Sequence, residues 1–328
     1  MNKKRNIFFI IIAFIVSTFF AIILTNYYIN KKQKELLNSI YESTHKNIFE
    51  KTQNLINDKQ NTSLAIAISL SKDETLYTHL KNRDFEKLNY IKIAKLIETN
   101  SKYKNIWIQI FDSNLNSVYR SWTNIRGSLN FRPDLKKVEA LKNISTSISA
   151  GLFNIGIRAR TPIFDENNNF YGALEVVTHF DSITEDLVKN NISPVVIGDK
   201  SIRKNLTNPL LSKLFIDDYY IANENVDMNL YNYIKENGVE KYINIDKFII
   251  ENGYLISKYP LFDENKKNLA YIINFMELKS INLENIKHIK IQTTLGTVIA
   301  LIILFTAILV YYLRDIKYQN SKNKILLN

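Results

Sequence analysis

Residues 158–180 read RARTPIFDENNNFYGALEVVTHF, and this stretch decides the fold. Apolar and polar residues alternate on both sides of the polar run 165–169, which predicts a turn between strands over 155–163 and 171–180. The same order of Pro, two apolar residues, Asp, Glu and Asn returns in residues 259–275, YPLFDENKKNLAYIINF. A strand–turn–strand signal that occurs twice favours two similar modules in tandem.

The residues before and after these stretches predict the rest of the two modules. A helical stretch over 73–98 is followed by alternation along 106–111, which predicts a strand with two distinct faces. Because Pro is favoured at the first helical position, 133–141 is expected to form a short helix. We expect one module over 73–190 and another over 191–276. Their further elements are strands over 117–122, 195–197, 242–250, 254–259 and 269–275, a helix that 181–185 caps, and a helix over 228–236.

Helices are expected on both sides of the modules. Residues 29–72 contain no Gly or Pro, and their apolar residues predict one long helix. The apolar spacing is loosely heptad-like, at Leu37, Ile40, Ile48 and Leu55. This helix therefore either packs on its own domain or forms a dimer seam near the membrane. Residues 277–290 also lack Gly and Pro, and we expect a return helix there.

Two apolar runs without a charged residue lie near the ends of the chain. A helix needs about 20 apolar residues to cross a bilayer, so we expect transmembrane helices over 7–28 and 291–313. Basic residues lie outside both runs, in segments 1–6 and 314–328, which predicts by the positive-inside rule that both ends are cytoplasmic. The chain is thus expected to be a multi-pass protein of a bacterial inner membrane, with residues 31–290 periplasmic or otherwise extracytoplasmic.

Composition excludes several classes of chemistry. The chain has no Cys, which rules out a disulfide framework, a thiolate nucleophile and a Cys-ligated metal. The formal net charge is +11, but the Lys residues are dispersed and no basic helix or aromatic platform occurs, so nucleic-acid binding is not expected. The four His are scattered, and no phosphate-binding loop or nucleophile elbow is present. We expect no metal, no cofactor and no enzymatic activity.

Strand alternation suggests where a ligand would bind. Glu175 shares a strand face with the apolar Ala173 and Val177, and a carboxylate in that position needs a partner if it is buried. The neighbouring strand offers Arg158 and Arg160 on a common face. One interpretation is a salt bridge between Glu175 and one of these arginines at the surface.

The other interpretation is a binding pocket. The strand over 117–122 adds Arg120 with Trp122, and Gln109 on the strand before it adds an amide. Arg has a planar fork that binds carboxylates bidentately. Several arginines beside one aromatic ring therefore predict a site for a small carboxylate, and both interpretations stay open at this point.

The whole region between the apolar runs resembles the double Cache sensor domains of bacterial receptors, most of all those of two-component sensor kinases. The resemblance lies in residues 106–122, 132–141, 158–180 and 259–275, and covers roughly 30–290. It implies an α+β fold with two tandem PAS-like modules on a long N-terminal helix, flanked by two transmembrane helices. It also implies that a small molecule binds on one face of the sheet in the membrane-distal module.

The amino-acid-binding branch of this family has an R-x-W-Y stretch at the start of the helix over the pocket. The matching stretch here resembles Arg132-Pro133-Asp134-Leu135, which keeps the Arg and lacks both aromatics. Val177 stands where that branch has an Asp that binds the amine. The resemblance thus adds Arg132 to the candidate residues and favours an organic acid over an amino acid.

These features predict a membrane-anchored sensor that binds a small ligand and passes a conformational signal across the bilayer. Residues 314–328 are too few for an output domain. We therefore expect either a separate partner, such as a histidine kinase, a chemoreceptor or a diguanylate cyclase, or an output domain missing from this chain. A homodimer is also expected. The alternative function is a two-span periplasmic scaffold that binds proteins and no small molecule.

Overall fold

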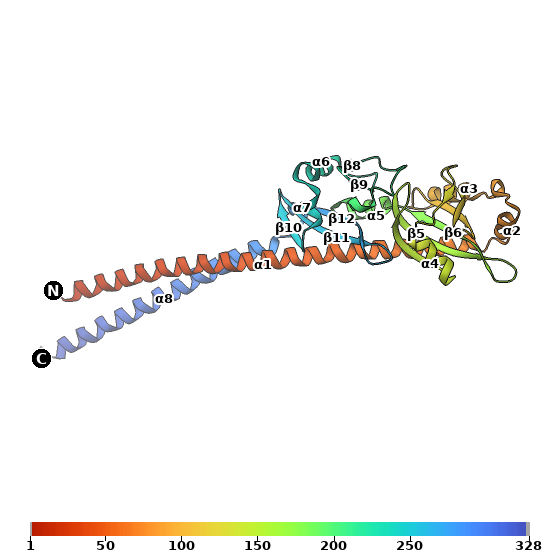
Figure 1. Ribbon diagram of the computed structural model, residues 1–328. Helices are drawn as coiled ribbons and strands as arrows, with labels where there is room; N and C mark the ends of the chain where they lie inside the picture. Colours follow the sequence, from red (N-terminus) through yellow and green to blue (C-terminus); the bar gives the residue numbers. More distant parts are fainter. Residues whose placement is uncertain (1, 326–328) are drawn as a thin grey trace. The chain divides into compact units, whose positions relative to one another are not determined.

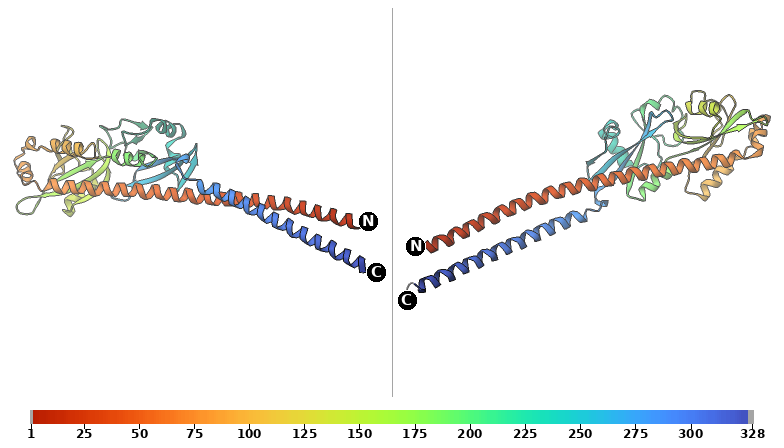
Figure 2. Two further views of the ribbon diagram at one scale, coloured as in Figure 1. Left: turned by 180° about the vertical axis from the view of Figure 1, so that it is seen from behind. Right: turned by 90° about the horizontal axis from the view of Figure 1, so that it is seen from below.

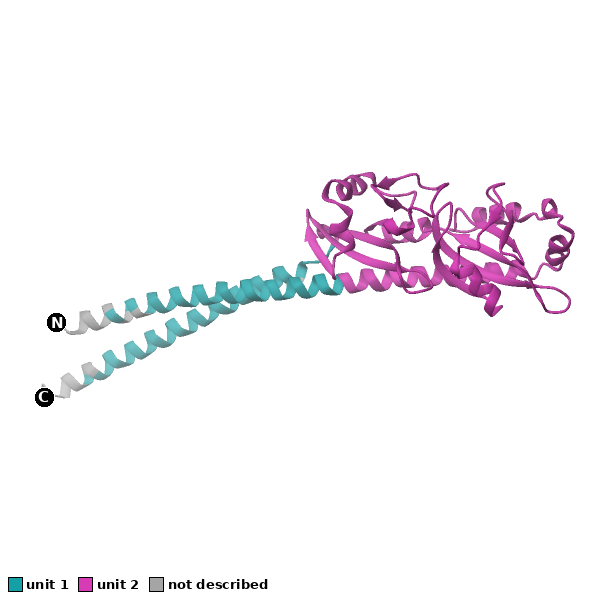
Figure 3. Cartoon of the chain, in the orientation of Figure 1, with its two compact units in different colours: residues 1–44, 281–328 teal, residues 45–280 magenta. Residues whose placement is uncertain are grey.

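The computed structural model describes residues 2–325, and within them the side chains from 9 to 321 apart from those at 10, 13, 285, 319 and 320 (Figure 1). The chain divides into two compact units, residues 1–44 with 281–328 and residues 45–280 (Figure 3). The basic side chains at 3–5, 322 and 324, on which the predicted orientation in the membrane partly depends, lie outside the described residues. So do residue 1 and residues 326–328, the ends of the predicted cytoplasmic segments.

Two helices form the first unit. They are α1 (Asn2–Ser71), as far as residue 44, and α8 (Glu284–Ile325). The helices run antiparallel, and the hydroxyl oxygens of Thr25 and Thr297 lie 3.1 Å apart between them. The predicted long helix is confirmed, since α1 continues without a break to Ser71.

One helical segment of the first unit has the length and composition of a membrane span. It covers Ile286–Tyr318 in α8, and the described residues contain no second segment that meets both conditions. Its apolar side chains are exposed, as those of a lipid-facing helix would be. The predicted span over 291–313 lies inside this segment, whereas the span over 7–28 stays a prediction.

The second unit contains two antiparallel six-stranded sheets. We call residues 73–190 the first module and residues 191–276 the second module. The strand order in the first module is β3-β2-β1-β6-β5-β4. Its elements are α2 (Glu74–Asn82), the 3-10 helix η1 (Phe85–Lys87), α3 (Tyr90–Asn100), β1 (Trp107–Asp112), β2 (Asn116–Arg120), β3 (Gly127–Ser128), α4 (Pro133–Leu141), β4 (Ser145–Ala150), β5 (Ile155–Phe164), β6 (Phe170–Thr178) and α5 (Asp181–Val188).

The second module repeats this plan with the strand order β10-β11-β12-β7-β9-β8. Its elements are β7 (Ile192–Gly198), η2 (Lys200–Ile202), β8 (Phe215–Ile216), β9 (Tyr219–Ile221), α6 (Met228–Asn237), α7 (Val239–Ile243), β10 (Phe248–Glu251), β11 (Tyr254–Phe262) and β12 (Asn268–Glu277), followed by η3 (Leu278–Ser280). The structure is therefore α+β, with a long N-terminal helix and two antiparallel sheets (Figure 1).

The repeated motif has the same geometry in both sheets. In each turn the Asp backbone N–H donates to the carbonyl oxygen four residues later, at 2.9 Å in Asp165–Asn169 and in Asp263–Lys267. The Asp carboxylate accepts two further backbone N–H bonds in both cases. Because each Asp satisfies the backbone of its own turn, the two turns set equivalent registers in β5–β6 and β11–β12, offset by 98 residues.

Within the second unit, α1 runs past both sheets (Figure 2). Ser63 of α1 lies 2.8 Å from the Thr178 hydroxyl in the first module, and Thr52 accepts from Asn274 in the second at 3.4 Å. The helix has one buried face with spacings of three and four residues, made up of Ile48, Thr52, Ile56, Lys59, Ser63 and Ala67. Ile48, one of the residues of the predicted heptad-like spacing, is 2% exposed within its own chain, so it is not free to form a dimer seam.

The two faces of the first-module sheet have different coverings. Ile108 and Val176 lie on the face that packs against Ala67 of α1 and against α2 and α3. Phe111 and Ala173 lie on the opposite face, beneath α4. The predicted two-faced strand is confirmed, and the face beneath α4 carries the candidate binding residues.

Three predicted elements are wrong, each because a local pattern was extended too far. The helical stretch over 73–98 is broken after α2, where Arg83 adopts a left-handed conformation with φ 58°. In 242–250, Tyr242 is the buried last-turn residue of α7, and the strand begins only at Phe248. The return helix does not start at 277, because Glu277 still pairs with Tyr254 in the sheet.

The first-module strand β4 and the short strands β3, β8 and β9 were not predicted. β4 reads STSISA, which has little of the apolar character that signals a strand, and it forms by pairing with β5. The predicted cap at Asp181 is also wrong: its carboxylate accepts from the Glu224 backbone N–H at 2.8 Å, and α5 has no side-chain cap.

Candidate functional site

A buried carboxylate lies at the centre of the first-module sheet. Glu175 in β6 is fully buried, opposite Gln109 of β1 on one side and Arg160 of β5 on the other. Its carboxylate accepts from Arg132 at 2.6 and 3.0 Å, from Arg158 at 3.1 Å and from Arg160 at 2.9 Å. The predicted salt bridge of Glu175 is therefore present, with both Arg158 and Arg160, but its predicted place at the surface is wrong, since this cluster is buried.

A second carboxylate, Asp134, completes the cluster. It lies in the first turn of α4, is 2% exposed, and accepts from Arg132 at 2.6 and 3.1 Å. Arg160 and the Ser149 hydroxyl, the latter at 2.9 Å, also donate to it. Asp134 lies in the 132–135 stretch but is not among the predicted site residues. An Asp in the first turn of a helix is common for reasons of capping and dipole, so its position alone does not indicate a site.

The cluster keeps its charges at neutral pH. Burial by itself would raise the pKa of Glu175, but Arg132, Arg158 and Arg160 hold that pKa down at about 2. Burial likewise opposes ionisation of Asp134, yet the arginines place its pKa far below the usual value. Burial lowers the pKa of Arg158 to about 10, which still leaves it protonated at neutral pH.

Arg120 lies on the same face but has no carboxylate partner among the residues that the structure describes. It is 4% exposed and stands opposite Gln109 in the β1–β2 pair. With the Gln109 amide oxygen turned toward it, Arg120 donates two bonds to that oxygen, at 3.0 and 3.2 Å, and a further bond to the Ile125 carbonyl. Burial and the neighbouring Arg126 lower the pKa of Arg120 to about 10. The site therefore has four arginines for two carboxylates, an excess of positive charge.

Aromatic rings border this excess charge. Trp107 and Trp122 stack at 4.6 Å with an angle of 10° between the rings, and Phe153 stands edge-on to both. The Arg120 guanidinium lies 5.2 Å from the Phe153 ring centroid and 6.0 Å from that of Trp122. Stacked rings beside a guanidinium form an apolar wall next to a cationic one.

A small cavity of about 10 Å³ lies between these groups. Gln109, Arg120, Trp122, Arg132 and Arg158, five of the six residues predicted from the sequence, line it. The sixth, Glu175, holds Arg132 and Arg158 in position and does not line the cavity. The other residues that line the cavity are Leu129, Gly151, Leu152, Phe153 and Asn154. The structure thus brings the predicted residues together, while their role as a ligand site stays a prediction.

Two side-chain donors at the cavity have no acceptor. The indole Nε1 of Trp122 and the amide Nδ2 of Asn154 are buried, and neither has a hydrogen-bond partner among the described residues. The Asn154 orientation is fixed, because its oxygen accepts from Arg158 at 3.0 Å. Nothing in the sequence distinguished Asn154 from an ordinary turn residue. Buried donors without acceptors are costly, and at a cavity they indicate a missing acceptor.

The loop 151–154 closes one side of the cavity. Gly151 N–H donates to the Asn154 carbonyl at 2.9 Å, which makes the loop tight. A Cβ on Gly151 would lie 2.7 Å from Arg158 Nη2, so a larger residue would displace that guanidinium. The second module holds the outer side of the loop, since Asn208 N–H donates to the Leu152 carbonyl at 3.0 Å and Leu210 N–H to that of Phe153 at 3.2 Å.

The other side of the cavity borders an open groove of about 790 Å³. Arg120 and Trp122 line both the cavity and the groove, so these two side chains separate the cavity from solvent. Trp122 is only partly buried, whereas Arg132 on the opposite wall is held by two carboxylates. The wall formed by Arg120 and Trp122 is therefore the one with fewer restraints.

Comparison with solved structures returned, among others, a sensor domain, a ligand-binding domain and a periplasmic domain. The sensor domain of the Vibrio cholerae histidine kinase DctB is 14% identical, over 75% of this chain and 98% of that one, with a TM-score of 0.42. The ligand-binding domain of the Campylobacter jejuni chemoreceptor Tlp3, in complex with 4-methylisoleucine, is 15% identical, over 75% and 95%, at 0.40. The periplasmic domain of Vibrio cholerae LuxQ is 14% identical, over 70% and 98%, at 0.39.

The sequence itself matches no protein-family model and no curated protein. The similar solved structures include a histidine kinase sensor domain and a chemoreceptor ligand-binding domain, which are the kinds of protein named in the predicted resemblance. Because the identities are 14–15% and the TM-scores are below 0.5, these likenesses carry no argument about the function of this chain. We therefore infer function from the side chains of the first module.

Proposed function

We propose that this chain is a membrane-anchored sensor whose first module binds a small organic carboxylate. The observation that carries the proposal is the set of donors around the small cavity. Among the described residues, both carboxylates of the cluster, Glu175 and Asp134, are already bound by arginines, while Arg120 has no carboxylate partner and the donors of Trp122 and Asn154 have no acceptor. A ligand carboxylate supplies a negative charge for Arg120, whose present acceptors are the neutral Gln109 and Ile125 oxygens, and acceptor oxygens for the donors of Trp122 and Asn154.

The same groups favour an acid without an amine. An α-amino group needs an acceptor, and Glu175 and Asp134 are each bound by at least two arginines. Val177, at the position of the amine-binding Asp in the resembling branch, is fully buried among Trp107 and Phe153. These rings suit a short apolar or aromatic group attached to the carboxylate.

Ligand entry requires the cavity to open. A volume of about 10 Å³ is about that of one water-sized probe, which is too small for a carboxylic acid. We infer that Arg120 and Trp122 turn toward the groove and admit the ligand between them. The cluster of Arg132, Arg158 and Glu175 stays in place and forms the rigid back wall of the site.

The proposal extends to anchoring and output. Ile286–Tyr318 would cross the membrane, and the apolar run over 7–28 would form the second span, which places residues 31–290 outside the cytoplasm. A ligand-dependent signal would reach a histidine kinase, chemoreceptor or cyclase partner, with the receptor acting as a homodimer. The proposal assigns binding and signalling to the chain and no catalytic step.

The test is thermal unfolding of the full chain in lipid nanodiscs with matched pairs of small molecules. Propanoate and benzoate should stabilise the protein, whereas propanamide, which has the shape of propanoate without its charge, should not. Stabilisation by a bound ligand follows RT ln(1 + [L]/Kd), about 2.7 kcal/mol at a hundredfold excess over Kd. A wider panel of organic acids is then compared with the corresponding α-amino acids.

Two arginine variants localise the effect. Arg120→Gln should abolish the stabilisation by acids, because Arg120 is the arginine of the cavity lining that has no carboxylate partner among the described residues. Arg126→Gln is the matched control, since Arg126 lines the groove but not the cavity and donates to the backbone of its own loop. If no acid stabilises the wild type, or if Arg120→Gln responds like the wild type, the assignment of this site is wrong.

A further inference from the structure

A buried lysine lies where α1 meets the first module. Lys59 is 2% exposed, and its ammonium nitrogen donates to the Ser182 hydroxyl at 2.7 Å. It also lies 3.9 Å from the centroid of the Tyr103 ring. Among the described residues no carboxylate lies within ion-pair distance of Lys59. A buried ammonium is normally paired with an anion, so a hydroxyl and a ring face are weak compensation.

The charged groups around Lys59 do not supply the missing anion. Lys102 is a nearby cation, and it pairs with Asp186 at 2.7 Å. Glu185 and Asp186 of α5 act on Lys59 only from a distance. The nearby imidazole of His179 adds no negative charge, and its burial lowers its pKa to about 3, so it is neutral.

Asp181 is the group that could respond to a charge on Lys59. It is 7% exposed, and its Oδ1 accepts from the Glu224 backbone N–H. Its Oδ2 is buried and has no hydrogen-bond partner among the described residues. Asp181 is also adjacent in sequence to Ser182, the present partner of Lys59. A buried cation without an anion and a buried carboxylate oxygen without a donor therefore lie at the same junction.

This junction joins three elements. Ser63, one turn after Lys59 in α1, lies 2.8 Å from the Thr178 hydroxyl at the end of β6. Ser182 belongs to α5, which leads from β6 of the first module to β7 of the second. His179 lies between Thr178 and Ser182 in the sequence. The centroid of its ring is 4.5 Å from that of Trp107, which stacks on Trp122. A change at Lys59 can therefore reach both the module connection and the aromatic wall of the cavity.

We propose that Lys59 gives the chain a second input, the proton concentration outside the cytoplasm. When a proton binds to the neutral amine, the new ammonium is attracted to the Asp181 carboxylate, and the contact of α1 with the start of α5 rearranges. The Trp107–Trp122 stack moves with it through His179. This input is independent of any organic ligand.

Burial sets the range in which the proton binds. Burial first, and the charge of Lys102 second, lower the pKa of Lys59 from 10.5 to about 7. Above pH 7 the amine is neutral in the folded protein, while the unfolded chain keeps it protonated up to 10.5. The unfolded state thus binds more protons between pH 7 and 10.5, and stability should rise with pH across that window.

Tryptophan fluorescence of the full chain in lipid nanodiscs tests the proposal. The chain has only two Trp, and both stand in the aromatic wall, so the emission reports on this region. Wild-type emission should change between pH 6 and 8 with a midpoint near 7. Lys59→Met, which has a similar length and no charge, should lose this change. A transition that persists in Lys59→Met, or a wild type without one, would overturn the proposal.

Two neighbouring variants should move the midpoint in opposite directions. Lys102→Met removes a cation that lowers the pKa of Lys59, so the midpoint should rise. Asp181→Asn removes an anion that raises this pKa, so the midpoint should fall. The rise of melting temperature between pH 7 and 9 should also be smaller in Lys59→Met than in the wild type, and a cooperative melting transition of the variant verifies that it is folded. If the pH midpoint of the emission change is the same in Lys102→Met and Asp181→Asn as in the wild type, a group other than Lys59 titrates.

Discussion

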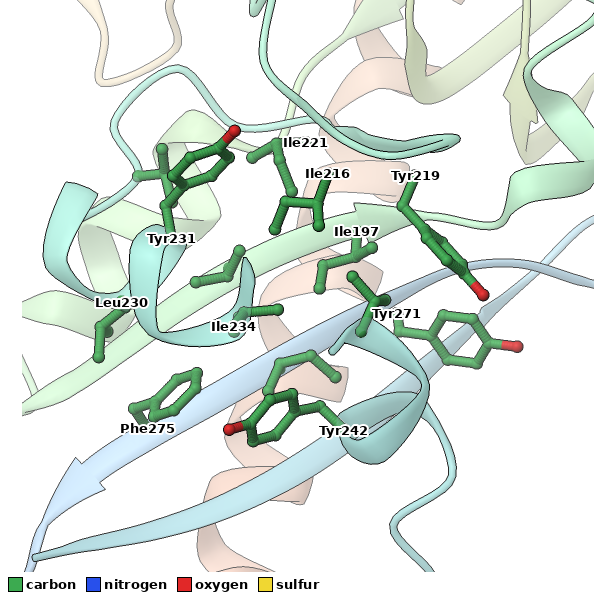
Figure 4. Close-up of a cluster of buried hydrophobic side chains, with 14 of the residues drawn as sticks. Ile197, Ile216, Tyr219, Ile221, Leu230, Tyr231, Ile234, Tyr242, Tyr271 and Phe275 are labelled. Carbon is green, nitrogen blue, oxygen red and sulfur yellow. The ribbon is translucent and has the colours of Figure 1, made fainter. Parts of the chain in front are cut away.

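Glu175 and Ile273 occupy equivalent positions in two sheets built on the same frame. The 98-residue offset that aligns the two Asp turns also aligns Arg158 with Ile256, and Gln109 and Val195 stand opposite Glu175 and Ile273 on the next strand. In the first module these positions hold charges and an amide, all buried. In the second they hold aliphatic side chains in a packed apolar core, part of which is drawn in Figure 4.

The difference separates what builds the fold from what builds the site. The turns and the strand alternation are shared, so the frame does not depend on what the buried face carries. A buried network of ion pairs is rarely more stable than an apolar core of the same volume. The buried face of the first module is therefore expected to contribute less to the folding free energy than the apolar core of the second module. We interpret the charged interior of the first module as consistent with the proposed binding role. We interpret the apolar core of the second module as a structural one.

The largest expected effect comes from placing a charge in the wrong module. Ile273→Glu buries a carboxylate in the second core without arginines, and the free energy of unfolding should fall by about 4 kcal/mol or more. Hydrogen exchange of the β12 amides in the full chain measures this effect. Ile250→Glu is the matched control, because Ile250 of β10 is 41% exposed. Equal protection in both variants would contradict the difference between the two interiors.

A smaller effect depends on pH. Because the pKa of Glu175 falls from 4.5 to about 2 on folding, its ionisation stabilises the protein above pH 4.5, by about 3 kcal/mol, and this is lost as pH falls toward 2. Glu175→Gln should therefore be less stable than the wild type at pH 7, and the gap should close in acid. Urea unfolding followed by Trp emission measures it, with the exposed Glu166→Gln as control. If the difference in unfolding free energy between the wild type and Glu175→Gln does not change with pH, the destabilisation does not come from the ionisation of Glu175.

The smallest effect is expected at Lys258, a charged residue on the strand of the second module that is equivalent to β5. Lys258 is equivalent to Arg160, but it is only partly buried and donates to the Ile243 carbonyl at 2.8 Å. Lys258→Met should cost at most about 1 kcal/mol in urea unfolding. Arg160→Met leaves two carboxylates short of a partner and should cost about 3 kcal/mol or more. Similar costs would mean that Lys258 belongs to a second charged site.

The sequence predicted those parts of the site that follow from alternation along single strands. Glu175, Arg158 and Arg160 share a face because the side-chain period of a strand is two residues, and the structure places them as expected. Arg132 came from a resemblance, and its neighbour Asp134 was passed over. Whether a helix folds back over a sheet is decided by tertiary packing, here of α4 onto Phe111 and Ala173, which leaves no local signal.

The errors in secondary structure have the same origin. β4 is held by six pairings with β5, although its serines carry little strand preference. Glu277 has the character of a helical residue, but pairing with Tyr254 keeps it in β12. The collapsed cavity could not be predicted either, because its size depends on how side chains from distant segments meet.

The break between β12 and α8 has a mechanical consequence. Three residues separate η3 (Leu278–Ser280) from Glu284, where α8 begins with its N–H bonded to the Asn282 side chain at 2.9 Å. The other connection between the two units is α1, a single helix of 70 residues that crosses the boundary at residue 44 unbroken. One connection is thus a continuous helix, and the other contains a break in regular structure at residues 281–283. A displacement of α1 beside Lys59 and Ser63 would therefore be carried into the first unit along one continuous helix, whereas a displacement of β12 would meet three non-helical residues before it reached α8.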